Sequence, residues 1–82
     1  MIAVEGGAVM VTVRVFSKSS GKAIKGKKVS VSFDGLLRGM ATEYTDSSGD
    51  AHFNVEPGSG KVYVDGNTVY KGNLAGRVVV YF

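Results

Sequence analysis

The chain has 82 residues, of which 44% are hydrophobic and 21% charged, and its formal net charge is +3. This length allows one small domain (residues 1–82) and excludes a second independent core. The composition lies within the globular range and outside that of disordered chains. There is no cysteine, so disulfides and thiolate metal sites are excluded, and packing and sheet pairing must stabilise the fold.

The first ten residues lack the basic segment and the apolar run of a secretion signal, and no later stretch is long enough to span a membrane. If Met1 is the native start, we expect a cytoplasmic protein. If the chain is a module of a longer protein, we expect it outside the cell or at the cell surface.

The first clear element is a strand over residues 8–16. Its valines recur at every second position, a period that a helix does not have. Ahead of it, residues 2–4 could form a short strand. Residues 17–28 then form a polar, flexible loop in which Ala23 and Ile24 are the only apolar anchor.

The basic character of the chain is concentrated in that loop, which contains no acidic residue and carries five lysines: Lys18, Lys22, Lys25, Lys27 and Lys28. Such a group of ammonium ions could bind a polyanion, either a nucleic acid or a sulfated glycan, with an affinity that falls as salt rises. The alternative is a solvated loop that keeps the protein soluble. The loop has no interleaved aromatic residue, which single-strand binding would favour.

Alternation resumes over residues 29–33, a second strand that ends at the turn dipeptide Asp34-Gly35. Residues 36–40 are compatible with a loop, a short strand or one helical turn. Beyond them, residues 41–45 and 50–56 are the next two predicted strands.

A β-hairpin is predicted between these two strands, because Asp46 and the following serines can hydrogen-bond their own backbone and Gly49 can adopt a positive φ. The predicted register pairs Thr45 with Asp50, Tyr44 with Ala51, Glu43 with His52 and Thr42 with Phe53. Ala51, Phe53 and Val55 would then point into the core.

Pairing of the preceding strand is expected to stop at Pro57-Gly58-Ser59-Gly60. The remaining elements are, in chain order, strand 61–64, turn 65–67, strand 68–71, connection 72–76 and strand 77–82. Seven strands with turn signals between them, and no helix of usable length, predict an all-β fold: a seven-stranded antiparallel Greek-key sandwich.

Three segments resemble a known family. They are GKAIKGKKVSV at residues 21–31, YTDSSGDAHF at residues 44–53, and Pro57-Gly58. In this order they resemble the carboxypeptidase regulatory-like domains and the related transthyretin-like and bacterial Ig-like modules. The resemblance implies an Ig-like or transthyretin-like accessory sandwich without chemistry of its own, commonly attached to secreted or surface proteins. It implies no catalytic residue.

His52 is the only histidine and, in the predicted register, lies opposite Glu43 on a face shared with Asp50. A histidine between carboxylates, with serines nearby, could belong to a hydrolase. The turn already explains Ser47 and Ser48, so we expect a solvent-facing cross-strand pair and no enzyme.

Asp46 and Asp50 flank a Ser-Ser-Gly loop, but their spacing does not match a calcium-binding EF-hand. A zinc site is also unfavourable with one histidine and no cysteine. The segment 58–61 ends like a phosphate loop, yet Val62 stands where serine or threonine is required. We expect neither a metal nor a cofactor.

Residues 77–82 carry no charge after Arg77 and are apolar on both faces. A sandwich covers one face of a strand, so the face with Val79 and Tyr81 needs a partner. The candidates are residues 2–4, a second copy of the chain and a neighbouring domain, and we favour self-association. The sequence therefore predicts a non-catalytic binding or structural module that contacts another protein or a surface; the alternative is polyanion binding through the lysines.

Overall fold

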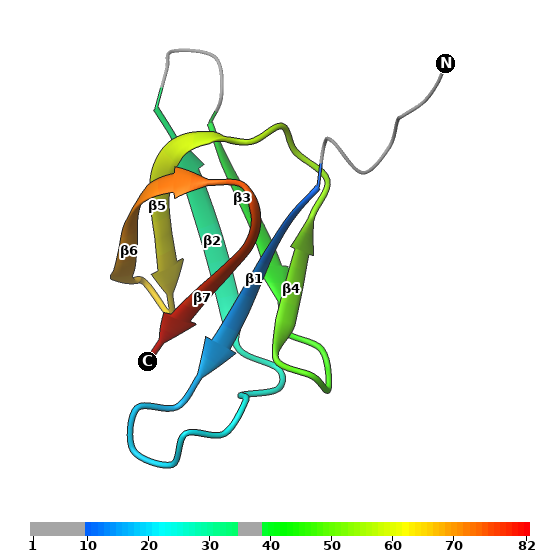
Figure 1. The fold of residues 1–82 in the computed structure, drawn as a ribbon, viewed down its shortest axis with the longest axis vertical. Helices are drawn as coiled ribbons and strands as arrows, with labels where there is room; N and C mark the ends of the chain where they lie inside the picture. The colour runs from blue at the N-terminus through cyan, green and yellow to red at the C-terminus, as the bar shows by residue number, and fades with distance from the viewer. Residues whose placement is uncertain (1–9, 35–38) are drawn as a thin grey trace.

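The computed structural model describes residues 10–34 and 39–82 and arranges them as strands in two layers (Figure 1). The strands are β1 (Val11–Phe16), β2 (Lys28–Phe33), β3 (Met40–Tyr44), β4 (Asp50–Phe53), β5 (Gly58–Val64), β6 (Asn67–Leu74) and β7 (Gly76–Tyr81). This confirms the all-β prediction. The expectations for residues 2–4, Val9 and residues 36–38 lie outside the described residues. Within the described ranges, no helix is long and apolar enough to cross a membrane.

One sheet has three strands in the order β4-β1-β7, and the other has four in the order β3-β2-β5-β6. β1 and β7 run parallel, whereas the other pairs are antiparallel. The prediction of a purely antiparallel sandwich is therefore wrong for β7. Alternating side chains identify the faces of a strand but not the direction of its neighbour. That direction is set here by the chain crossing from β6 to β7, between the sheets, at Ala75.

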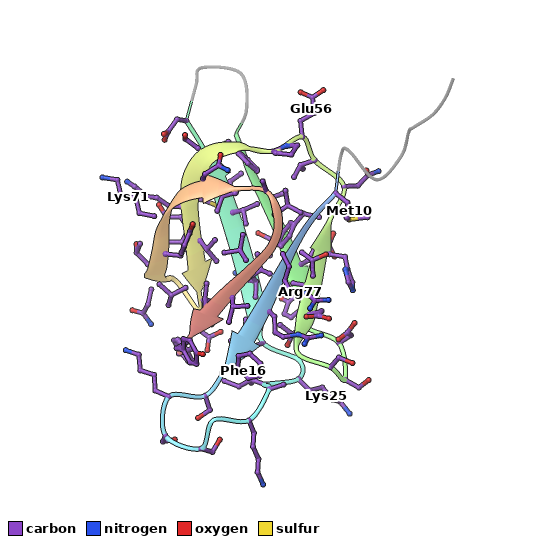
Figure 2. The ribbon with its side chains drawn as sticks, in the orientation of Figure 1. Met10, Phe16, Lys25, Glu56, Lys71 and Arg77 are labelled. Carbon is purple, nitrogen blue, oxygen red and sulfur yellow. The ribbon has the colours of Figure 1, made fainter. Side chains whose placement is uncertain are left out.

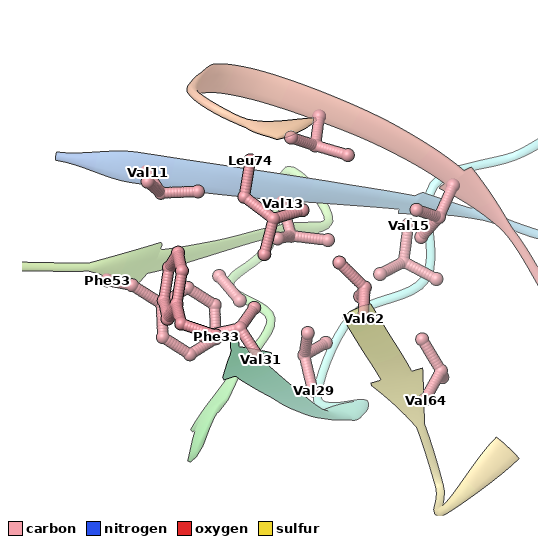
Figure 3. Packing of buried hydrophobic residues seen from close by; sticks show 13 residues of the cluster. Val11, Val13, Val15, Val29, Val31, Phe33, Phe53, Val62, Val64 and Leu74 are labelled. Carbon is pink, nitrogen blue, oxygen red and sulfur yellow. The ribbon is translucent and has the colours of Figure 1, made fainter. Parts of the chain in front are cut away.

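The core between the sheets is built mainly of valine, whose branched side chain suits a pleated strand (Figure 3). The buried residues come from the inward positions of six strands: Val11, Val13, Val15, Val29, Val31, Phe33, Ala51, Phe53, Val62, Val64, Leu74, Val78 and Val80. Val55 and Val69 pack against this cluster while remaining partly exposed. Burying each valine contributes about 1.5–3 kcal/mol, so the alternation seen in the sequence is the main source of stability.

The predicted hairpin between residues 41–45 and 50–56 is wrong. β3 pairs with β2 and β4 pairs with β1, so the two strands belong to different sheets. Residues 46–49 do form a tight turn, in which Asp46 Oδ1 accepts hydrogen bonds from the N–H groups of Ser48 (2.8 Å) and Asp50 (3.1 Å). Turn chemistry reverses the chain, but it does not oblige the flanking strands to pair with each other.

The second predicted turn does make a hairpin. Asp65 and Gly66 join β5 to β6 with φ values of 50° and 85°, the pair of positive angles that a two-residue hairpin turn requires. Both strands are longer than expected: Gly58 already pairs with Leu74, at the far end of β6. The pairing of the preceding strand does stop before Pro57, since β4 ends at Phe53. The predicted start of the next strand at residue 61 is wrong, and so is the connection at residues 72–76 apart from Ala75, because β5 and β6 pair through their glycines.

Candidate interaction surface

Among the strands that the structure describes, β7 lies at an edge of the three-stranded sheet and is hydrogen-bonded to β1 alone (Figure 1). The N–H of Phe82 donates to the carbonyl of Phe16 (2.9 Å), and the carbonyl of Phe82 accepts from the N–H of Lys18 (3.0 Å). Both backbone groups of Phe82 thus face β1. Because these groups alternate in direction along a strand, those of Arg77, Val79 and Tyr81 face the open edge.

The same three residues of β7 project their side chains from the outer face of the sheet. Val79 is 43% exposed and Tyr81 is 53% exposed. In the parallel register Val79 lies beside Arg14, and Tyr81 lies beside Phe16. The Phe16 and Tyr81 rings stack with their centroids 5.8 Å apart. The two residues that the sequence singles out for an interface therefore share one face and one free edge.

An ion pair crosses the middle of this outer face. Arg14 Nε and Nη2 donate to the two carboxylate oxygens of Asp50 at 2.7 Å and 2.9 Å. This bidentate contact holds the pKa of the Asp50 carboxyl below its ordinary value and raises that of Arg14. Arg14 was not predicted from the sequence, because the pair depends on β1 lying beside β4. Its only signal in the sequence is an arginine among the polar positions of an alternating strand.

Next to this pair, His52 lies opposite Thr12 on β1 and not opposite Glu43 as predicted. The Thr12 hydroxyl is 3.0 Å from Nδ1 of His52, and Asp46 Oδ2 is 3.4 Å from Nε2. A hydroxyl, an imidazole and a carboxylate that contact one another in this order are the components of nucleophilic catalysis. Here the side chains of His52 and Asp46 are 52% and 48% exposed, so water competes for each contact.

Asp46, Asp50 and His52 are also the kinds of residue that bind metals, and their ligand atoms lie within 4.8 Å of one another. The carboxylate oxygens already have protein partners, however. Arg14 occupies both oxygens of Asp50, and the two backbone N–H groups of the turn occupy Oδ1 of Asp46. These N–H groups are the main reason why the pKa of Asp46 is lowered. The geometry fits a cluster that stabilises the turn.

The lysine-rich loop lies at one end of the molecule, where Lys25 is seen far from Met10 and Glu56 (Figure 2). It is held in place by Thr45, which is only 4% exposed. The Thr45 hydroxyl donates to the carbonyl of Ile24 (2.6 Å) and accepts from the N–H of Lys27 (2.8 Å). The backbone of Thr45 adds bonds to Gly26 and Lys27. The predicted flexible loop is therefore anchored along its second half.

The five lysines do not form one cluster. Lys27 is partly buried, with Nζ 3.1 Å from Asp65 Oδ2 and 5.0 Å from the centre of the Phe82 ring. The other four are exposed: Lys18, Lys22, Lys25 and Lys28. The structure thus separates one lysine with a local partner from four whose charges face solvent.

Comparison of the chain with protein-family models, with curated proteins and with solved structures finds no match.

Proposed function

We propose that the chain is a non-catalytic β-sandwich module that binds a protein partner through the edge and outer face of β7. The observation that carries this proposal is that one strand combines backbone groups that pair with no other described strand with the exposed side chains of Val79 and Tyr81. An open edge offers main-chain hydrogen bonds to an incoming strand, and its alternate side chains supply contacts beside them.

A Greek-key sandwich of the Ig-like or transthyretin-like kind is part of this proposal. Two features support it. β4 returns to lie beside β1, as the fourth strand of a Greek key returns to the first, although β1 and β2 here lie in different sheets. The segments that resemble the carboxypeptidase regulatory-like domains also lie at the loop before β2 and the turn before β4. Modules of that kind have no chemistry of their own, in agreement with the open surroundings of His52.

Binding at the edge can be tested with a synthetic extended peptide of alternating valine and threonine, titrated into the protein while its amide NMR spectrum is recorded. Addition of a strand to β7 predicts the largest shifts at the amides of Arg77, Val79 and Tyr81. The Val79→Lys, Tyr81→Lys variant should remain folded and lose these shifts. Perturbation confined to other strands would refute the proposal.

A second candidate function is polyanion binding, because four exposed lysines lie within, or directly after, a loop that Thr45 holds in place. Replacing Lys18, Lys22, Lys25 and Lys28 with serine should release the protein from a heparin column at much lower salt. The single Lys27→Ser variant is the control, since its ammonium group already faces Asp65 and should contribute little. Equal effects of Lys27→Ser and of a single Lys25→Ser would show that only net charge matters.

A further inference from the structure

We infer that the partner of β7 is the β7 strand of a second copy of this chain, which pairs antiparallel to the first across a twofold axis at Val79. This inference depends on the proposed binding role of the β7 edge and specifies the occupant. Its basis is a register in which the strand is complementary to itself.

The backbone of β7 permits this pairing. Val79 would lie opposite the partner's Val79, and Arg77 would lie opposite the partner's Tyr81. These are the residues whose N–H and C=O groups face the open edge, since Phe82 directs both of its groups to β1. Three facing pairs would each exchange two hydrogen bonds, the pattern of closely spaced antiparallel pairs. The two three-stranded sheets would become one continuous sheet.

The side chains are complementary in the same register. Residues directly opposite in an antiparallel pair share a face, so the Arg77 guanidinium would lie beside the ring of the partner's Tyr81. Arginine over a tyrosine ring is a favourable cation–π contact, and Tyr81 already stacks on Phe16. Around the axis, Val79 would pack on the partner's Val79, flanked on each side by Arg14, whose charge is paired with Asp50.

Charge favours the antiparallel arrangement over a parallel one. The lysine-rich loop lies near the C-terminal end of β7, since Lys18 bonds to Phe82, and the chain carries a net charge of +3. A twofold axis perpendicular to β7 places the two loops at opposite ends of the pair, where their lysines do not meet. It also closes the assembly at two copies, because the same surface is used by both.

Single cysteines provide the test, because the chain has none of its own. Opposed residues in such a pair have Cα atoms about 5.5 Å apart, within the range of a disulfide. Val79→Cys should form a disulfide-linked dimer under mild oxidation at least about tenfold faster than Ser48→Cys, an exposed site remote from β7, because pairing raises the local thiol concentration. Light scattering should show a concentration-dependent dimer of the wild type.

The register is tested by position 77. In the inferred pair, the two copies of residue 77 are separated by about 14 Å along the strands, so Arg77→Cys alone should cross-link no faster than Ser48→Cys. Arg77→Cys combined with Tyr81→Cys should cross-link efficiently. Rapid cross-linking of Arg77→Cys alone would overturn the register.

A wild type that stays monomeric at millimolar concentration, with Val79→Cys no faster than Ser48→Cys, would overturn self-pairing. The edge-binding proposal fails separately, when a wild type that is monomeric at the concentration of the titration shows no shift of the β7 amides with the extended peptide. A monomer whose β7 amides still respond to the peptide would retain the binding role and exclude the second copy.

Discussion

At the scale of single residues, Thr45 links the β3–β4 connection to the loop between β1 and β2. It precedes the turn at residues 46–49 and bonds, through side chain and backbone, to Ile24, Gly26 and Lys27. These bonds continue the β2–β3 ladder beyond its last pair, Lys28 and Tyr44, and they tie the β3–β4 connection to the loop before β2.

Thr45→Val should therefore reduce the free energy of unfolding by about 1–3 kcal/mol, because it leaves the Lys27 N–H and the Ile24 carbonyl without the hydroxyl they bond to. Urea denaturation measures the effect. The control is Thr68→Val, an exposed position on β6, which should change stability by less than about 0.5 kcal/mol. Similar results for the two variants would contradict the anchoring role.

Two carboxyls on the outer face should make stability depend on acid pH. The pKa values of Asp46 and Asp50 are lowered in the folded chain, by backbone N–H groups and by Arg14 respectively. A lowered folded pKa contributes stability above the unfolded value of about 4. That contribution is lost as the pH falls from there through the folded values.

The melting temperature, followed by circular dichroism from neutral pH down to acid pH, measures this dependence. Asp50→Asn should melt lower than the wild type at neutral pH and show a smaller decrease on acidification. If the melting temperature of Asp50→Asn falls with pH as steeply as that of the wild type, the Arg14–Asp50 pair does not contribute to the pH dependence of stability.

At the scale of elements, the turn at residues 46–49 changes the partner of a strand. β3 enters it from one sheet and β4 leaves it in the other. Gly49 fits because it is buried with a φ of +83° against the β1–β2 loop; a Cβ there would lie 2.8 Å from Ala23 Cβ and 3.1 Å from the Val15 carbonyl. Both the positive φ and the close contact with Ala23 and Val15 therefore require glycine at this position.

Gly66 is a matched comparison for Gly49, because its φ is +85° but a Cβ would meet nothing within 4 Å. Gly66→Ala should cost about 1–2 kcal/mol for the left-handed backbone alone. Gly49→Ala should cost that amount and about 1–3 kcal/mol more for overpacking. Chemical denaturation of both variants measures their free energies of unfolding. Equal decreases would show that the β1–β2 loop accommodates the added Cβ at residue 49 without destabilising the fold.

Strands and their faces could be predicted from the sequence, because burial on one face imposes a period of two, as at Val11, Val13 and Val15. Strand partners could not. The turn chemistry at Asp46 is local, while the choice of β1 as the neighbour of β4 depends on contacts across the whole core. The exposed positions Val79 and Tyr81 were visible as apolar residues on a strand with no charge after Arg77, but the Arg14–Asp50 pair needed the β1–β4 register.

At the scale of the whole molecule, the lysine-rich loop and the edge of β7 occupy different positions along the long axis. The β1–β2 loop with its three solvent-facing lysines lies at one end, and Met10 and Glu56 lie at the other (Figure 2). The free edge of β7 runs between them (Figure 1). A polyanion at the loop and a strand at the edge would therefore occupy different parts of the surface, so the two proposed activities can be removed by separate substitutions.

The parallel pairing of β1 with β7 has a mechanical consequence. β1 begins at Val11 and β7 ends at Tyr81, and the two strands lie side by side over six paired positions, so these points are at opposite ends of one ladder. A pulling force applied at Val11 and Tyr81 would load the hydrogen bonds in shear, and they would have to rupture together. We expect single-molecule stretching between cysteines at positions 11 and 81 to give a much higher rupture force than stretching between positions 58 and 74, a facing antiparallel pair that opens bond by bond.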